Sequence, residues 1–117
     1  MREIALETET TGLNPKSGHR VVEIGCVEMI NHGATGEVFH AYVNPERDMP
    51  EDAFRVHGLS EEFLRGHPLF AKVADDFLDV IGDSQLIIHN AQFDMGFLNA
   101  ELERLGKTAL DMARSTD

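Results

Sequence analysis

Residues 2–12 read REIALETETTG, an apolar run that passes into two glutamates and a threonine-glycine segment. The run is typical of a short strand over residues 2–7, and the change of composition after it predicts a turn at residues 11–15. Side chains alternate along a strand, so Glu7 and Glu9 would point to one side, within reach of one cation. Spacing alone leaves two interpretations open: a metal site, or two solvated acids at a strand end.

Further strands are expected on both sides of a helical region. Residues 21–30 and 37–43 are rich in Val, Ile and aromatic side chains, which predicts two antiparallel strands joined by a glycine-containing turn at residues 31–36. Residues 86–88 predict a short apolar strand that is reached through a helical crossover and is therefore parallel. The expected fold class is α/β.

The helical pattern occupies the remaining segments. Apolar residues spaced by three and four predict an amphipathic helix over residues 69–81, and a later helix is expected to bury Met95, Leu98, Leu102 and Leu105. The first helix is expected from Pro50 to His57, and a short second helix is expected after a cap at Ser60. The helix over residues 69–81 is expected to end at Gly82, and the last helix is expected to run from a cap at Asn90 to Leu105.

Length and composition indicate one globular domain. The chain has 117 residues, of which 42% are hydrophobic, and no apolar run is long enough to cross a bilayer. The first residues lack the apolar stretch of a signal peptide, so the expectation is a cytoplasmic location and no membrane partner. The single cysteine, Cys26, lies in an apolar run and is expected to be a buried small hydrophobe.

The net charge of −11 argues against binding of duplex nucleic acid through a broad basic face. It does not argue against a nucleic-acid enzyme, because a site for divalent cations must concentrate carboxylates, and the bound cations then face the phosphate. A third acid fits such a site. Asp94 ends the segment HNAQFD (residues 89–94), in the first turn of the expected last helix, although the helix dipole alone would also favour an aspartate there.

Four segments together resemble one known family. They are LETETTG at residues 6–12, VEIG at 22–25, VHGL at 56–59 and HNAQFD at 89–94, and they follow one another in the order found in the DnaQ-like DEDDh 3′-to-5′ exonucleases. This family includes proofreading subunits of bacterial DNA polymerases. The resemblance implies a ribonuclease H-like fold, in which helices flank a mixed sheet made of a three-stranded antiparallel ribbon and a parallel strand.

The resemblance also implies a set of site residues. Glu9 and Asp94 match catalytic acids that bind metal, and Glu7 stands where the family normally has aspartate. The cofactors implied are two Mg²⁺ or Mn²⁺ ions per site. The positions that match nucleotide-binding residues are Thr10, Leu13, His57 and Phe93.

The implied reaction is release of nucleoside 5′-monophosphates from a single-stranded or frayed 3′ end in proofreading or repair. DNA is favoured over RNA as the substrate, although the nucleotide-binding positions fit either sugar. A polymerase subunit is the implied protein partner. For His57 a structural interpretation stays open, because a histidine before glycine at a helix end often binds the last carbonyls. His19, His32, His40 and His67 match nothing and are expected to be surface or structural residues.

Two departures from the family pattern bear on activity. Glu7 carries an extra methylene, which is expected to weaken binding of metal, and no histidine follows His89 to act as general base. Asp111 and Asp117 are poor substitutes for the acid of that last motif. Residues 1–117 are therefore expected to form a single, incomplete exonuclease domain with an uncovered apolar sheet face and a tendency to form a homodimer. The alternative is a non-catalytic, degenerate nuclease that serves as a nucleotide- or protein-binding module.

Overall fold

A computed structural model describes all residues from 1 to 117. One mixed sheet has the strand order β3-β2-β1-β4-β5. Its central strand β1 pairs antiparallel with β2 and parallel with β4, which confirms the predicted antiparallel ribbon extended by a parallel strand. The strands are β1 (Arg2–Thr10), β2 (Val21–Ile30), β3 (Gly33–Tyr42), β4 (Gln85–Ile87) and β5 (Ser115–Thr116).

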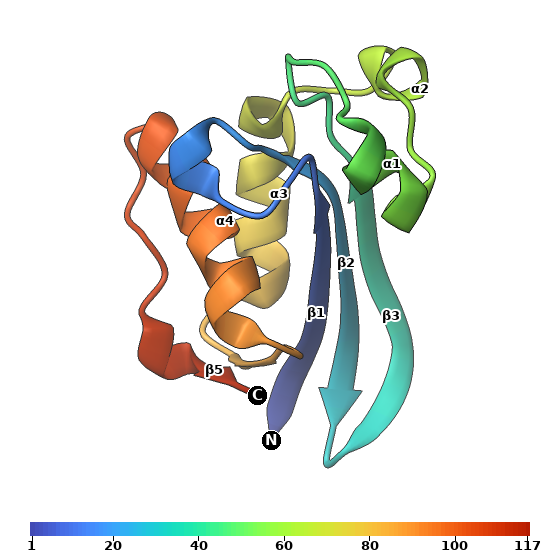
Figure 1. The fold of residues 1–117 in the computed structure, drawn as a ribbon. Helices are drawn as coiled ribbons and strands as arrows, with labels where there is room; N and C mark the ends of the chain where they lie inside the picture. Colours follow the sequence, from blue (N-terminus) through green and yellow to red (C-terminus); the bar gives the residue numbers. More distant parts are fainter.

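The two long helices lie together on one face of the sheet, and the two short ones lie near the end of β3 (Figure 1). Gly58 ends the first helix in a left-handed conformation, and the Ser60 hydroxyl accepts a hydrogen bond from Phe63 N–H to cap the second, as predicted. The helices are α1 (Glu51–His57), α2 (Glu61–Arg65), α3 (Phe70–Ile81) and α4 (Ala91–Arg104), with 3₁₀ turns at Pro15–Ser17 and Met112–Arg114.

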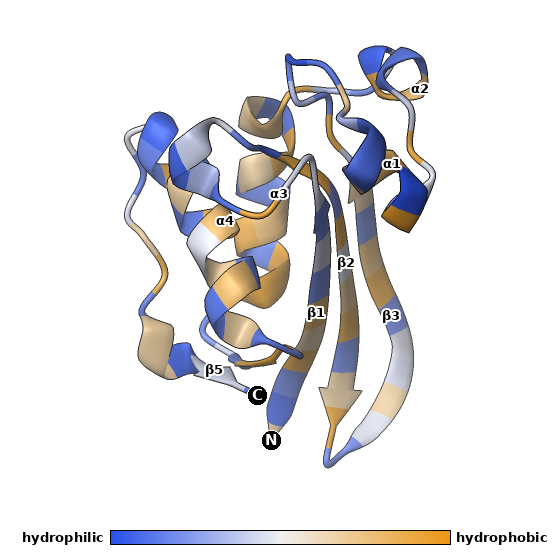
Figure 2. Cartoon of the chain, viewed as in Figure 1, coloured by the Kyte–Doolittle hydropathy of each residue, from blue (hydrophilic) through white to orange (hydrophobic).

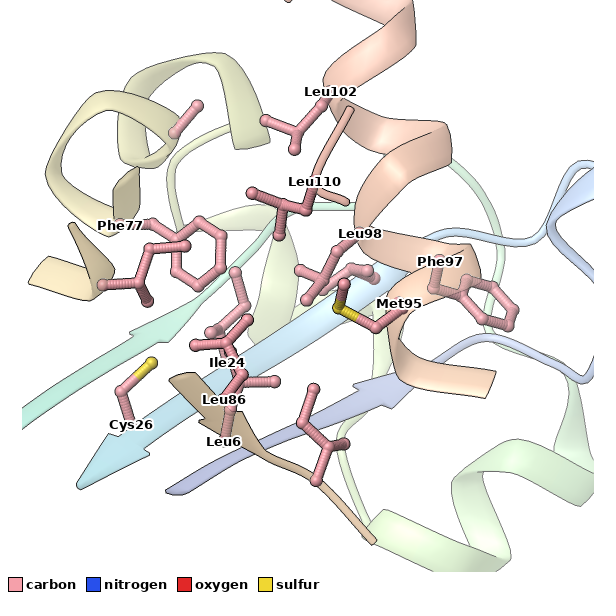
Figure 3. Packing of buried hydrophobic residues seen from close by; sticks show 14 of the residues in the cluster. Leu6, Ile24, Cys26, Phe77, Leu86, Met95, Phe97, Leu98, Leu102 and Leu110 are labelled. Atoms are coloured by element: carbon pink, nitrogen blue, oxygen red, sulfur yellow. The ribbon is translucent and has the colours of Figure 1, made fainter. Parts of the chain in front are cut away.

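The hydrophobic core fills the space between the sheet and helices α3 and α4. Figure 2 shows hydrophilic and hydrophobic residues alternating along the strands, which is the pattern of a sheet with one buried face. Figure 3 shows Leu6 and Ile24 of the sheet packed toward Met95 and Leu98 of α4, and all four are at most 4% exposed. Cys26 is also buried here, as predicted, and burial raises the pKa of its thiol to about 12.

The opposite face of the sheet carries the carboxylates of β1. In the register of the sheet, Glu9 pairs with Glu23 of β2, which pairs in turn with Tyr42 of β3. Glu7 pairs with Gly25 of β2, which pairs in turn with His40 of β3. Residues paired in this way project to the same side of a sheet. On this open face Val27 and Val38 are 37% and 69% exposed, so part of it is apolar.

The sheet differs from the sequence prediction at three places. The first strand continues to Thr10 because its pairing with β2 persists beyond Glu7. The hairpin between β2 and β3 is tighter than predicted, because Asn31 and His32 both adopt positive φ angles (50° and 69°), and β3 starts at Gly33. The short strand β5 was not predicted: it holds two residues and pairs with β4 at the edge of the sheet.

One expectation for the last helix was wrong and another holds in part. Asn90 is the N-cap residue of α4, as predicted, but its side chain makes no capping hydrogen bond; it has a left-handed φ of 58°, and its backbone N–H donates to Asp117 Oδ1 (2.8 Å). Leu105 is 37% exposed, because it lies one residue past the helix, where the chain turns at Gly106. The other three predicted residues, Met95, Leu98 and Leu102, are fully buried. No helix is long and apolar enough to span a bilayer.

Candidate active site

The β1 carboxylates lie on the open face of the sheet, one on each side of Thr8. Glu7 is exposed and stands beside Gly25, where an added Cβ would meet Glu7 Cγ at 3.5 Å. Glu9 is partly buried and pairs in register with Glu23. The common side predicted for Glu7 and Glu9 is confirmed by this register.

Asp94 reaches the same region from the first turn of α4. Asp94 is 7% exposed, and it lines a pocket of about 510 Å³ together with Glu7, Gly25, His40 and His89. Helix α4 begins just after β4, whose parallel pairing with β1 ends at Ala5 and Ile87. This topology carries Asp94 to the level of Thr8, the residue that separates Glu7 and Glu9 along β1.

The surroundings of Asp94 change the pKa of its carboxyl group. That pKa is raised from 3.8 to about 6, mainly by burial; hydrogen bonds from the hydroxyl and backbone of Thr8 act to lower it, and the charges of Glu9 and Glu7 act to raise it. The Thr8 hydroxyl is buried next to it without a hydrogen bond of regular geometry. Asp94 is therefore close enough to both glutamates to be affected by their charge.

Glu9 has the same type of environment. Burial raises its pKa, the charge of His57 lowers it, and the charges of Glu23 and Glu7 raise it. Glu9 is thus repelled by Glu7 and Glu23, and Asp94 is repelled by Glu9 and Glu7. A cation between them would remove that repulsion, and carboxylate oxygens are the ligands that Mg²⁺ and Mn²⁺ prefer.

The donor chemistry fits a hard divalent cation, but the side chains do not yet surround one. No group of three or more His, Cys, Asp or Glu side chains is close enough in this structure to hold a metal ion. Glu7 and Asp94 line the 510 Å³ pocket, whereas Glu9 lines a neighbouring one. Bringing Glu7, Glu9 and Asp94 around one ion would require rotation of the glutamate side chains. Glu7 is exposed and free to rotate.

The second cavity, of about 610 Å³, contains the four residues predicted to bind a nucleotide. Thr10 and Leu13 come from the end of β1 and the turn after it, His57 from the end of α1, and Phe93 from the start of α4. Glu9 lines the same cavity and so connects it to the carboxylates. Leu13 is 85% exposed, and Phe93 rests on Phe97 with ring centroids 4.9 Å apart.

Two of these residues use their polar groups within the chain. The Thr10 hydroxyl donates to Gly12 O (2.6 Å), which tightens the turn. His57 Nδ1 accepts from Leu59 N–H (3.0 Å), so the proton of the neutral ring is on Nε2, which donates to Thr10 O (3.0 Å). His57 therefore ties α1 to β1, and it does not bind the last carbonyls of its own helix.

His19 is a lining residue of this cavity that the sequence did not indicate. Its ring lies against Gly12, where an added Cβ would stand 2.5 Å from three ring atoms. The Thr11 hydroxyl, on a fully buried residue, accepts from Arg20 N–H (3.0 Å), and its own hydrogen can reach only His19 Nδ1 (3.0 Å). The neutral ring of His19 thus has its N–H at Nε2. His40 was expected to be a surface or structural residue; it is exposed, and it also lines the pocket of Glu7 and Asp94.

Comparison with known sequences identifies related proteins. The model of the RNase_T family, described as exonuclease, matches residues 4–117. DNA polymerase III subunit epsilon of Rickettsia conorii is 58% identical over 120 residues, covering 100% of this chain and 52% of that protein. The same subunit of Escherichia coli is 48% identical over 108 residues, covering 89% of this chain and 44% of that protein. The chain thus spans about half the length of these curated relatives.

Solved structures support the fold. A product-bound exonuclease I superposes with a TM-score of 0.84 at 15% identity, over 95% of this chain and 27% of that one. Exonuclease X in complex with 5′ overhanging duplex DNA gives a TM-score of 0.65 at 25% identity, over 81% of this chain and 52% of that one. The ribonuclease H-like fold predicted from the sequence is confirmed by this likeness.

The contact between Gly12 and His19 can be tested by mutation. Gly12→Ala should displace the His19 ring and leave the Thr11 hydroxyl without an acceptor, which costs about 1–3 kcal/mol of unfolding free energy. Urea unfolding would measure the loss. In a His19→Ala background the same Gly12→Ala change should cost much less, because the ring is already gone. Equal costs in the two backgrounds would contradict this contact.

The raised pKa of Asp94 predicts how stability depends on pH without metal. Between 3.8 and about 6 the folded state holds a proton that the unfolded state has lost, so stability falls as the pH rises through this window. Asp94→Asn removes the effect and should stabilise the chain by about 1–2 kcal/mol near pH 8, after allowance for solvent screening. It should change little near pH 4. Urea unfolding in the presence of chelator would measure the stabilities of wild type and Asp94→Asn at pH 4 and pH 8. Equal stabilities of the two proteins at pH 8 would count against a raised pKa of Asp94.

Proposed function

We propose that this chain, which belongs to the RNase_T exonuclease family, removes nucleotides one at a time from the 3′ end of a nucleic acid strand by phosphodiester hydrolysis. The observation that carries the proposal is the position of Glu9. It lines the cavity that contains the four predicted nucleotide-binding residues, and its charge acts on Asp94 in the neighbouring pocket. A terminal nucleotide in the larger cavity would thus have its phosphate beside the carboxylates.

The carboxylates would hold the metal. Glu7, Glu9 and Asp94 offer only oxygen ligands, which suits two Mg²⁺ or Mn²⁺ ions that would polarise the phosphate and activate a water molecule. Binding would relieve the charge repulsion that adds to burial in raising the pKa values of Asp94 and Glu9, and the exposed Glu7 side chain could turn toward the ion. Glu7 is the weakest element of the set, since its carboxylate extends about one bond further than that of an aspartate.

The nucleotide pocket would bind mainly through shape. Phe93 is half-buried and supported by Phe97, which suits stacking against a base or sugar. Leu13 projects from the turn after β1 and would close the other side of the pocket. Thr10 and His57 hold the walls together through their internal hydrogen bonds.

The alternative proposal is a binding module without turnover. Residues 1–117 offer no histidine after His89 to act as the general base that the family resemblance implies. His40 and His89 line the carboxylate pocket, but neither belongs to a matched motif for that role. Binding of metal and of a nucleotide without release of product would favour this alternative.

Partners follow from the relatives, which are named as subunits of DNA polymerase III. We infer that the substrate is a single-stranded or frayed 3′ end, of DNA rather than RNA, and that a polymerase subunit in the cytoplasm is a partner in proofreading or repair. The partly apolar open face, with Val27 and Val38, would also support a homodimer. A monomer in light scattering at micromolar concentration would count against the dimer.

Activity can be tested with the chain as it stands. A single-stranded DNA oligonucleotide labelled at its 3′ end should release a labelled nucleoside 5′-monophosphate in Mn²⁺, and chelator should abolish the release. Asp94→Asn should also abolish it, whereas Asp83→Asn, an exposed aspartate beyond α3, should not. Release that does not require Asp94 would show that another site or a contaminant is responsible.

Restoring aspartate at position 7 should improve metal binding. Glu7→Asp shortens the side chain by one methylene, and Mg²⁺ demands near-ideal geometry at about 2.0–2.1 Å, so we expect tighter binding of Mg²⁺ and Mn²⁺ in titration calorimetry. Glu3→Asp is the matched control on the same strand, because it makes the same change at the other end of β1. An unchanged affinity in Glu7→Asp would remove Glu7 from the metal site.

A further inference from the structure

A buried ion pair joins helix α4 to the start of β2. Glu101 is 1% exposed, and its carboxylate accepts from Arg20 Nε (2.8 Å), Arg20 Nη2 (2.7 Å) and Val21 N–H (3.0 Å). Two parallel bonds between a guanidinium and a carboxylate fix direction as well as distance. Neither residue lines the two pockets described above.

Arg20 is in turn bonded to the turn that follows β1. Its backbone N–H donates to Thr11 Oγ1 (3.0 Å), and its carbonyl accepts from Thr11 N–H (2.9 Å). Thr11 stands between Thr10 and Gly12, which both line the larger cavity. A movement of Arg20 would therefore shift the wall of the nucleotide cavity.

Glu101 is similarly connected to Asp94. It follows Asp94 by seven residues in α4, which is about two helical turns and the same face of the helix. Asp94 faces Thr8 at one end of this stretch, and Glu101 binds Arg20 at the other. The pair thus fixes how far α4 can slide or rotate relative to β1, and so sets where Asp94 stands relative to Glu7 and Glu9.

Stability alone is a weak reason for such a pair. Replacing a buried ion pair by apolar residues of similar size is often neutral or stabilising, whereas fixing the register of packed elements is its best-attested role. Changing a group that is hydrogen-bonded to a metal ligand commonly alters metal affinity by about 10- to 100-fold, and Arg20 and Glu101 would act on Asp94 through helix α4 and not through a direct bond.

We propose that Arg20 and Glu101 are positioning residues, which hold α4 and the Thr10–Gly12 turn in the register that lets Asp94 share divalent cations with Glu7 and Glu9. The inference rests on the proposed function, since it presumes that these carboxylates bind metal. Neither residue is expected to touch metal or substrate.

The test compares two ways of removing an Arg–Glu pair, with Mn²⁺ as the probe. In one variant, Arg20→Met is combined with Glu101→Leu. In the matched control, Arg2→Met is combined with Glu28→Leu, which removes the pair near the other end of β1 and β2. Urea unfolding would establish that each variant folds, and titration calorimetry would give its Mn²⁺ affinity. We expect the first variant to fold and to bind Mn²⁺ about 10- to 100-fold more weakly than wild type, and the control to bind like wild type.

A milder variant covers the case in which the double change prevents folding. Arg20→Lys keeps the charge but loses the two-pronged bond, and it should weaken Mn²⁺ binding in the same direction. Equal Mn²⁺ affinity in wild type and in the folded Arg20 and Glu101 variants would overturn the inference and leave the metal site standing. Failure of both variants to fold would also overturn it, because the pair would then serve the fold itself. Failure of wild type to bind Mn²⁺ would remove the proposed metal-dependent function and the inference with it.

Discussion

The structure depends on the alternation of side chains along the central strand β1. Ile4 and Leu6 point into the core against α3 and α4, while Glu7 and Glu9 point to the open face. Because β1 pairs with β2 on one side and with β4 on the other, a shift of one residue would exchange the two sets. Such a shift would bury two carboxylates and expose the apolar side chains, so core packing also fixes the acids in place.

Local patterns were sufficient for most of the fold. The three- and four-residue spacing in residues 69–81, the cap at Ser60 and the glycine after His57 each act within a few residues, and all three predictions are confirmed. Features set by distant contacts were not predictable in this way. The left-handed Asn90 is bonded to Asp117, and β5 exists because it pairs with β4.

The candidate site shows the same division. Motif resemblance indicated Thr10, Leu13, His57 and Phe93, which line one cavity, but it gave no sign of His19 or Glu101. His19 enters the cavity because its ring packs on Gly12, and Glu101 meets Arg20 across eighty-one positions of the sequence. A glutamate amid apolar helix positions is a weak sequence signal, since its partner lies on another element.

The internal bonds of Thr10 and His57 have a consequence for which molecules the larger cavity can tell apart. The threonine hydroxyl already donates to a carbonyl, and both nitrogens of the His57 ring are engaged with the backbone. Neither Thr10 nor His57 therefore has a free N–H or O–H donor with which to read the edge of a base. Discrimination by hydrogen bonding needs such groups, and contact with an aromatic face tolerates any base. The contacts that Thr10, His57 and Phe93 can offer therefore carry no selectivity among bases of their own.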